Sequence, residues 1–102
     1  MQIAELTEFQ VNVLLGTANG ASRVCAVMMP GENDDKERKE QLTTQVKDVD
    51  KLIEWGLMKD ISDEFTEQIK LAKLNYKVDS KVVIITEMAE AMFRDSGSRS
   101  VN

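Results

Sequence analysis

The stretch 36–47 holds the densest group of side chains that could bind a ligand through charge or hydrogen bonds, because basic, amide and hydroxyl side chains are gathered there. The set is Lys36, Arg38, Lys39, Thr43, Thr44, Gln45 and Lys47. If this stretch is a helix lying in the major groove of DNA, Gln45 can read adenine, and Arg38 can read guanine or contact phosphate. Lys39 and Lys47 would contact phosphates, which position a helix without specifying a sequence.

Acidic side chains interrupt this basic stretch at Glu37, Glu40 and Asp48. A solvated helix face that binds nothing is therefore the alternative interpretation of residues 36–47. A second basic stripe comes later in the chain and consists of Lys70, Lys73 and Lys77. These lysines could contact DNA phosphates or an acidic partner, or they could only complement the carboxyl end of a helix dipole.

Catalytic and metal-binding chemistry finds little support in the residue types. The chain has no histidine and a single cysteine, Cys25, which we interpret as a small buried hydrophobe without a neighbouring base. The acidic cluster Asp34, Asp35, Glu37 and Glu40 lacks the glycine and the alternate ligand spacing of a calcium loop. We therefore expect no enzyme, no catalytic residue, no metal site and no cofactor.

The bulk composition predicts one small globular domain. The chain has 102 residues and a net charge of −5, which argues against broad binding to nucleic acid but leaves room for a local basic patch. We expect a single domain over residues 1–95 and a disordered polar tail over 96–102. Neither a signal peptide nor a membrane-length apolar run is evident, so a cytoplasmic location without membrane contact is expected.

Local patterns predict a mainly helical chain. The clearest helix covers 36–55, where Leu42, Val46, Val49 and Ile53 recur at helical spacing. Glycine, proline and capping residues mark the ends of the other segments. The remaining expected helices are 7–17 (capped by Thr7), 22–29, 63–77 (capped by Ser62) and a last one after Thr86, and the expected strands are 57–61 and 81–85.

Three segments carry a family resemblance. The segments "DKLIEWGLMKDI" (50–61), "KVVIITEMAEAMF" (81–93) and "ELTEFQVNVLL" (5–15) resemble parts of the MarR and PadR families of winged-helix transcriptional regulators. The resemblance implies a winged helix-turn-helix fold, mainly α with a small two-stranded β-wing and a helix inserted between the wing strands. It also implies a DNA-binding transcriptional regulator that acts as a homodimer through its first and last helices.

Three departures from that pattern favour a second hypothesis. The connection before residue 36 is long and acidic, the wing holds a helix of about 15 residues in place of a short basic loop, and residues 62–80 contain no arginine. An acidic winged-helix module that binds a protein, and no DNA, has these properties. A continuous positive surface that joins the helix at 36–55 to the inserted helix would favour double-stranded DNA. Positive charge broken up by acidic residues would favour a protein partner.

Overall fold

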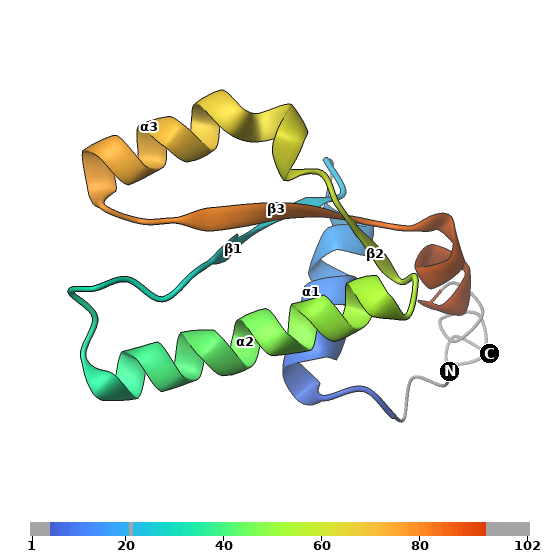
Figure 1. Ribbon diagram of the computed structural model, residues 1–102. Coiled ribbons are helices and arrows are strands. Elements are labelled where there is room, and N and C mark those ends of the chain that lie inside the picture. Colours follow the sequence, from blue (N-terminus) through green and yellow to red (C-terminus); the bar gives the residue numbers. More distant parts are fainter. Residues whose placement is uncertain (1–4, 21, 94–102) are drawn as a thin grey trace.

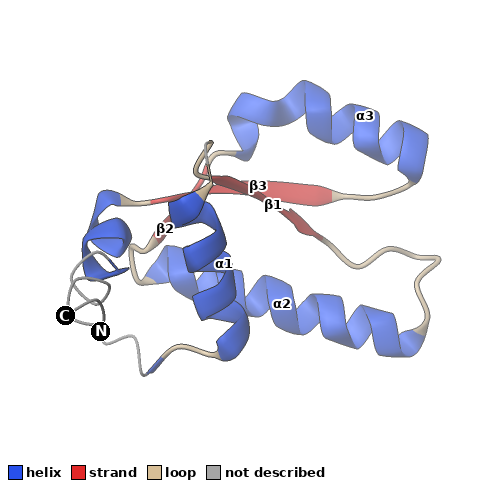
Figure 2. Cartoon of the chain, turned by 180° about the vertical axis from the view of Figure 1, so that it is seen from behind, coloured by secondary structure: helices blue, strands red, loops and turns tan. Residues whose placement is uncertain are grey.

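A small antiparallel sheet with helices on both faces forms the protein (Figures 1 and 2). The computed structural model describes residues 5–20 and 22–93, so the expected tail at 96–102 lies outside the described residues. Along the chain the elements are α1 (Glu8–Asn19), β1 (Val24–Met28), α2 (Lys36–Glu54), β2 (Met58–Asp60), the 3₁₀ turn η2 (Ser62–Phe65), α3 (Thr66–Tyr76) and β3 (Ser80–Ile85). A further helical segment begins at Glu87 and continues to the end of the described chain.

The central strand of the sheet is the last one in the sequence. The strand order is β1-β3-β2, and both pairs are antiparallel. Cys25 lies opposite Val83 in the first pair, and Lys59 lies opposite Ile84 in the second. Because β3 has a partner on each side, β1 and β2 are the two edge strands.

The two faces of the sheet are covered unequally. Alternate side chains of the strands, such as Val27, Val83 and Ile85, face α1 and α2 and form the core with Leu14 and Leu52. The opposite face lies toward α3, which contributes no buried residue (Figure 1). The hydrophobic core is therefore built on one face of the sheet, and α3 is an outlying helix over the other face.

Several helix ends follow the expected local chemistry. Thr7 caps α1 through a capping box with Gln10, and the Asp35 carboxylate accepts a hydrogen bond from the Arg38 amide at the start of α2. Gly56 ends the α2 turn with a positive φ of 77°. Thr86 accepts a hydrogen bond from the amide of Ala89, as expected for the cap of the last helical segment.

The largest correction concerns residues 22–29, which form no helix. Residues 24–28 are strand β1, so the sheet has a third strand in addition to the two that were expected, which correspond to β2 and β3. A short uncharged run has no decisive period, and it fits a strand or a buried helix equally well. Pairing with β3, more than 50 residues away in the sequence, decides in favour of the strand.

Two further expectations about helix ends are wrong. The first helix was expected over 7–17, stopped by Gly16 and the segment 18–20, but α1 continues through Gly16 to Asn19, because a single glycine weakens a helix without ending it. Ser62 was expected to cap the inserted helix, but its hydroxyl accepts a hydrogen bond from the Val82 amide. The inserted helix itself is confirmed in position, since η2 and α3 lie between β2 and β3.

Candidate binding surfaces

The exposed side of α2 brings five of the predicted contact residues together. Lys36, Lys39, Thr43, Thr44 and Lys47 line one shallow hollow of about 660 Å³, together with Glu40. Residues three and four apart lie on the same side of a helix, which explains why this set converges. We call this hollow the lysine groove.

Two predicted residues of α2 lie outside the lysine groove. Arg38 and Gln45 are half-buried and share the side of α2 that carries the buried Leu42 and Val49. The Arg38 guanidinium donates a hydrogen bond to the side chain of Gln41 at 3.1 Å. A DNA duplex in contact with the lysine groove would therefore not reach Arg38 or Gln45.

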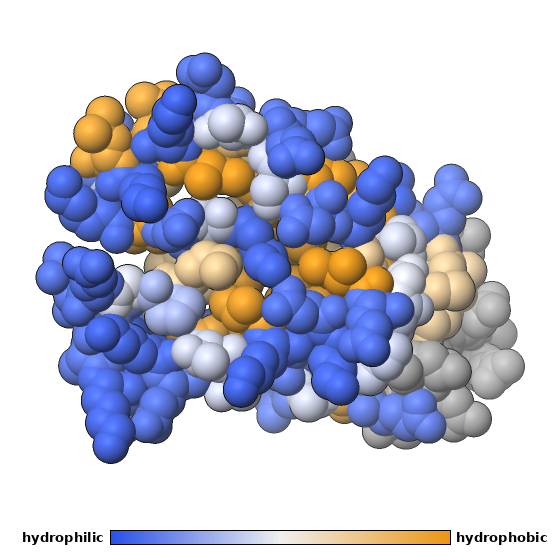
Figure 3. Space-filling view, viewed as in Figure 1, coloured by the Kyte–Doolittle hydropathy of each residue, from blue (hydrophilic) through white to orange (hydrophobic). Residues whose placement is uncertain are grey.

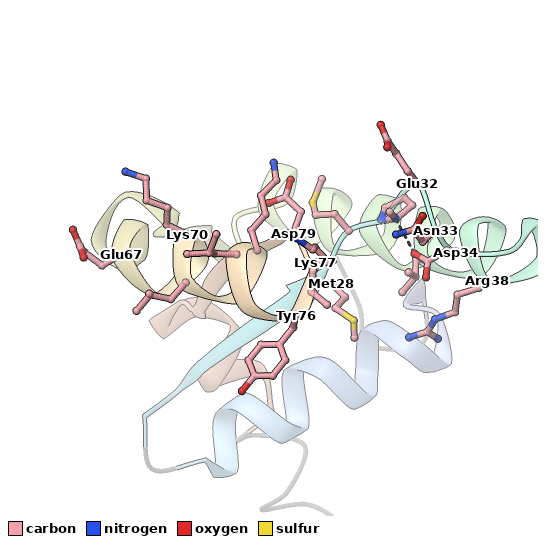
Figure 4. A pocket seen from close by; sticks show the side chains of 18 residues that line it. Met28, Glu32, Asn33, Asp34, Arg38, Glu67, Lys70, Tyr76, Lys77 and Asp79 are labelled. Carbon is pink, nitrogen blue, oxygen red and sulfur yellow. Dashed lines mark hydrogen bonds between the residues drawn. The ribbon is translucent and has the colours of Figure 1, made fainter.

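A larger cleft opens between α3 and the segment that joins β1 to α2 (Figure 4). It has a volume of about 1310 Å³. One wall is α3, the other is residues 29–34 with the start of α2, and Met28 at the end of β1 lies between them. Its lining includes Met28, Pro30, Asp34, Arg38, Leu42, Lys70, Leu71, Lys73, Leu74, Tyr76, Lys77 and Val78. We call this hollow the α3 cleft.

Large apolar side chains in the α3 cleft are exposed to solvent. Leu71 is 54% exposed, Leu74 70%, Tyr76 75% and Met28 43%. Figure 3 shows hydrophobic surface along α3 and in the hollow below it, whereas the exposed side of α2 is hydrophilic. Scattered exposed leucines are ordinary, but a group of them at one concave surface is typical of a binding site.

The charges of the α3 cleft cancel. Its basic residues are Arg38, Lys70, Lys73 and Lys77, and its acidic residues are Glu32, Asp34, Glu67 and Asp79. The structure therefore places the predicted stripe Lys70, Lys73 and Lys77 beside four carboxylates. Because a polyanion is repelled by carboxylates as strongly as it is attracted by ammonium groups, this surface has no general preference for phosphate.

The two groups of lysines do not form one surface. The lysine groove lies on the side of α2 away from its buried face, while α3 lies across the sheet from α2 (Figure 1). A continuous positive surface joining α2 to α3 was the property expected of a DNA-binding protein. The positive charge is instead divided between two hollows, and acidic residues accompany it in both.

Sequence reasoning missed the residues that make the α3 cleft apolar. The helical spacing of Phe65, Ile69, Ala72 and Tyr76 predicts that these residues face inward. In the structure the first three are half-buried and Tyr76 is exposed. Leu71 and Leu74 lie on other sides of α3, so the helix carries apolar residues beyond the stripe that packs on the sheet. Apolar residues on more than one side of this helix were the sequence feature from which an apolar binding surface could have been predicted.

The lone cysteine lies on the core side of β1. Cys25 is half-buried, and desolvation raises the pKa of its thiol. A thiol with a raised pKa is protonated near neutral pH and is a poor nucleophile. Among residues 5–20 and 22–93, no cluster of histidine, cysteine and acidic side chains could hold a metal ion.

Comparisons with protein-family models, with curated proteins and with solved structures find no match for this chain. Within the described part of the chain, no helix combines the length and the apolar character that crossing a membrane requires. The two hollows, with the charges and apolar side chains that line them, are the features of the described residues that bear on function.

Proposed function

We propose that this protein is an interaction module that binds a segment of another protein in the α3 cleft. The observation that carries the proposal is the group of exposed apolar side chains, Met28, Leu71, Leu74 and Tyr76, that line this one concave surface. The second hypothesis drawn from the sequence was an acidic winged-helix module that binds a protein and no DNA, and the divided positive charge favours a protein partner over DNA.

The chemistry of the cleft defines the kind of segment that fits. Apolar side chains of the partner would pack on Leu71 and Leu74, and each fully buried side chain of this size contributes roughly 1.5–3 kcal/mol. Lysines and carboxylates at the margin would pair with charges of either sign, which sets the orientation of the segment more than its affinity. The expected ligand is thus an apolar segment flanked by mixed charges.

A displayed library of random peptides tests this proposal directly. We expect selected peptides to carry two or more large apolar residues and to bind the purified full chain. Leu74→Ser should weaken their binding about 10-fold or more, because the substitution removes apolar contact area without touching the core. Leu15→Ser on α1 is the matched control, since Leu15 is also exposed, at 39%, and lies outside the cleft. Selected peptides that bind both variants equally well would contradict the proposal.

A DNA-binding regulator is the second candidate, and the lysine groove is the observation that favours it. In that case the fold would be a winged-helix variant in which α3 is inserted in the wing. Only α2 lies between β1 and β2, where a helix-turn-helix would place two helices. The homodimer expected from the family resemblance would pair α1 with the last helical segment.

Fluorescence anisotropy with random duplex DNA at about 50 and 200 mM salt separates the two candidates. A DNA-binding protein would bind more weakly at the higher salt and would lose binding when Lys36, Lys39 and Lys47 are changed to alanine. We expect no binding at either salt concentration. Salt-dependent DNA binding that is lost in the triple alanine variant would contradict the proposed protein-binding function and would favour DNA binding at the lysine groove.

A further inference from the structure

The free edge of the sheet runs into the α3 cleft at Met28. This residue is the last one of β1, and its side chain lines the cleft together with α3 (Figure 4). Side chains alternate along a strand, so Met28 and Ala26 lie on the face toward α3, opposite to the core side chain of Val27. A segment that contacts Met28 in the cleft is therefore also within reach of the β1 edge.

The register shows which backbone groups of β1 face outward. The Met29 amide donates a hydrogen bond to the Asp79 carbonyl at 2.8 Å. Hydrogen-bonded pairs alternate in an antiparallel ladder, so the odd-numbered residues of β1 bond to β3, and the amides and carbonyls of its even-numbered residues point to the free edge. Among residues 5–20 and 22–93, the hydrogen bonds of these outward groups are limited to one, which the Ala26 carbonyl accepts from the Cys25 thiol at 3.7 Å.

The two edges of the sheet differ in how well they are protected. The β2 edge is only three residues long, and two of them, Lys59 and Asp60, are charged and exposed. The β1 edge is five residues long and contains neither a charged residue nor a proline. Short length, charge and proline are the features that keep edge strands from pairing with other chains. Since β1 has none of them, it is the edge that can accept a further strand.

We propose that the partner segment in the α3 cleft binds in an extended conformation and adds a fourth strand to the sheet beside β1. This inference rests on the proposed function, because it states how the same segment is held. The added strand would lie about 4.8 Å from β1. Its residue opposite Met28, and every second residue from there, would face α3 as Met28 does. Those residues are expected to be apolar, and the intervening ones polar.

An extended segment uses a feature of this site that a helical segment leaves unused. A helix satisfies its own backbone groups, so it would contact the cleft through side chains alone and would leave the outward amides and carbonyls of β1 unpaired. An added strand bonds to these groups through its main chain, which supplies affinity, while its alternate side chains enter the cleft and supply specificity. The partner is thus a segment of alternating apolar and polar residues.

The peptides selected on the full chain are the probe for this binding mode. Ala26→Pro removes one outward amide, and Ala26 does not line the cleft, so the side-chain contacts there are unchanged. We expect the variant to bind the peptides about 10-fold more weakly, because one hydrogen bond across the edge is lost. The Ala26 amide makes no bond to β3, so the fold should remain intact by circular dichroism. Ala26→Ser keeps the amide and should bind like the unchanged chain.

Two further measurements leave the protein unaltered. Methylation of single backbone amides in a selected peptide should weaken binding about 10-fold at every second position and have little effect at the positions between, because only alternate amides of an added strand face β1. A helical peptide would show no such alternation. In hydrogen exchange, the amides of Ala26 and Met28 should become protected when the peptide binds.

Failure of this inference and failure of the proposed function give different results. Peptides that bind Leu74→Ser weakly but bind Ala26→Pro as tightly as the unchanged chain would keep the α3 cleft as the site and overturn the added strand. Free exchange of the Ala26 and Met28 amides in the complex would overturn it as well. Selection of no peptide, or of peptides that Leu74→Ser leaves unaffected, would overturn both. Should Ala26→Pro fail to fold, the methylated peptides and the exchange of the two amides decide in its place.

Discussion

Two glycines in this chain should respond in opposite directions to the same substitution. Gly56 has a φ of 77°, where an alanine side chain is strained, and a Cβ there would lie 3.2 Å from the Met88 methyl group. Gly16 lies within α1, and a Cβ there would meet no atom within 4 Å. Gly56→Ala should therefore destabilise the fold by about 1–2 kcal/mol, the cost of a left-handed alanine. Gly16→Ala should stabilise it by roughly 0.5–1 kcal/mol, because alanine favours the helix.

Thermal and urea denaturation of the two variants measure these effects. For a domain of this size, 1 kcal/mol shifts the midpoint temperature by roughly 4–8 °C. The midpoint should therefore fall by about 4–16 °C in Gly56→Ala and rise by a few degrees in Gly16→Ala. The carbonyl of Gly56 accepts a hydrogen bond from the Thr86 hydroxyl at 2.8 Å, so Gly56→Ala should also loosen the last helical segment. Equal midpoints in the two variants would refute this account of the α2–β2 turn.

Three further predictions follow from local contacts. Asp35→Ala should cost about 1 kcal/mol of unfolding free energy, measured in urea, because the Arg38 amide loses its capping carboxylate. Hydrogen bonds from Ser62 lower the pKa of the Asp60 carboxyl in the folded protein. The carboxylate should therefore stabilise the fold above the ordinary pKa of aspartate, and this stabilisation should be lost as the pH falls through the lowered pKa of the folded state. Asp60→Asn should make the unfolding free energy depend less on pH on the acid side of a stability–pH curve. Cys25 should react slowly with a thiol reagent at neutral pH and rapidly once the chain is unfolded, since burial raises its pKa.

Elements with a strong local period could be predicted from the sequence. Leu42, Val46 and Val49 specify α2 through their spacing alone, and the structure confirms a helix at Lys36–Glu54. Strand β1 could not be predicted in the same way, because the apolar residues of this uncharged run show no helical or strand spacing. The run becomes a strand because it pairs with β3. The error at residues 22–29 therefore reflects a tertiary interaction that no local pattern contains.

The binding surfaces were predictable only in part. Helical spacing was enough to bring Lys36, Lys39 and Lys47 to one side of α2. The α3 cleft depends on how α3 lies against the segment before α2, and the exposure of Leu74 and Tyr76 follows from that placement. Because the spacing within a helix does not determine where the helix docks, sequence patterns alone could not locate the cleft.

The outlying position of α3 separates the stability of the fold from the shape of its cleft. No residue of α3 is buried, whereas the core is formed by α1, α2, the sheet and the segment after Thr86. Detachment of α3 should thus cost far less free energy than global unfolding, and the cleft can widen while the core stays intact. Substitutions on α3 should therefore change the unfolding free energy little. Natural variation on this helix can alter the surface that contacts a partner while the core keeps its stability.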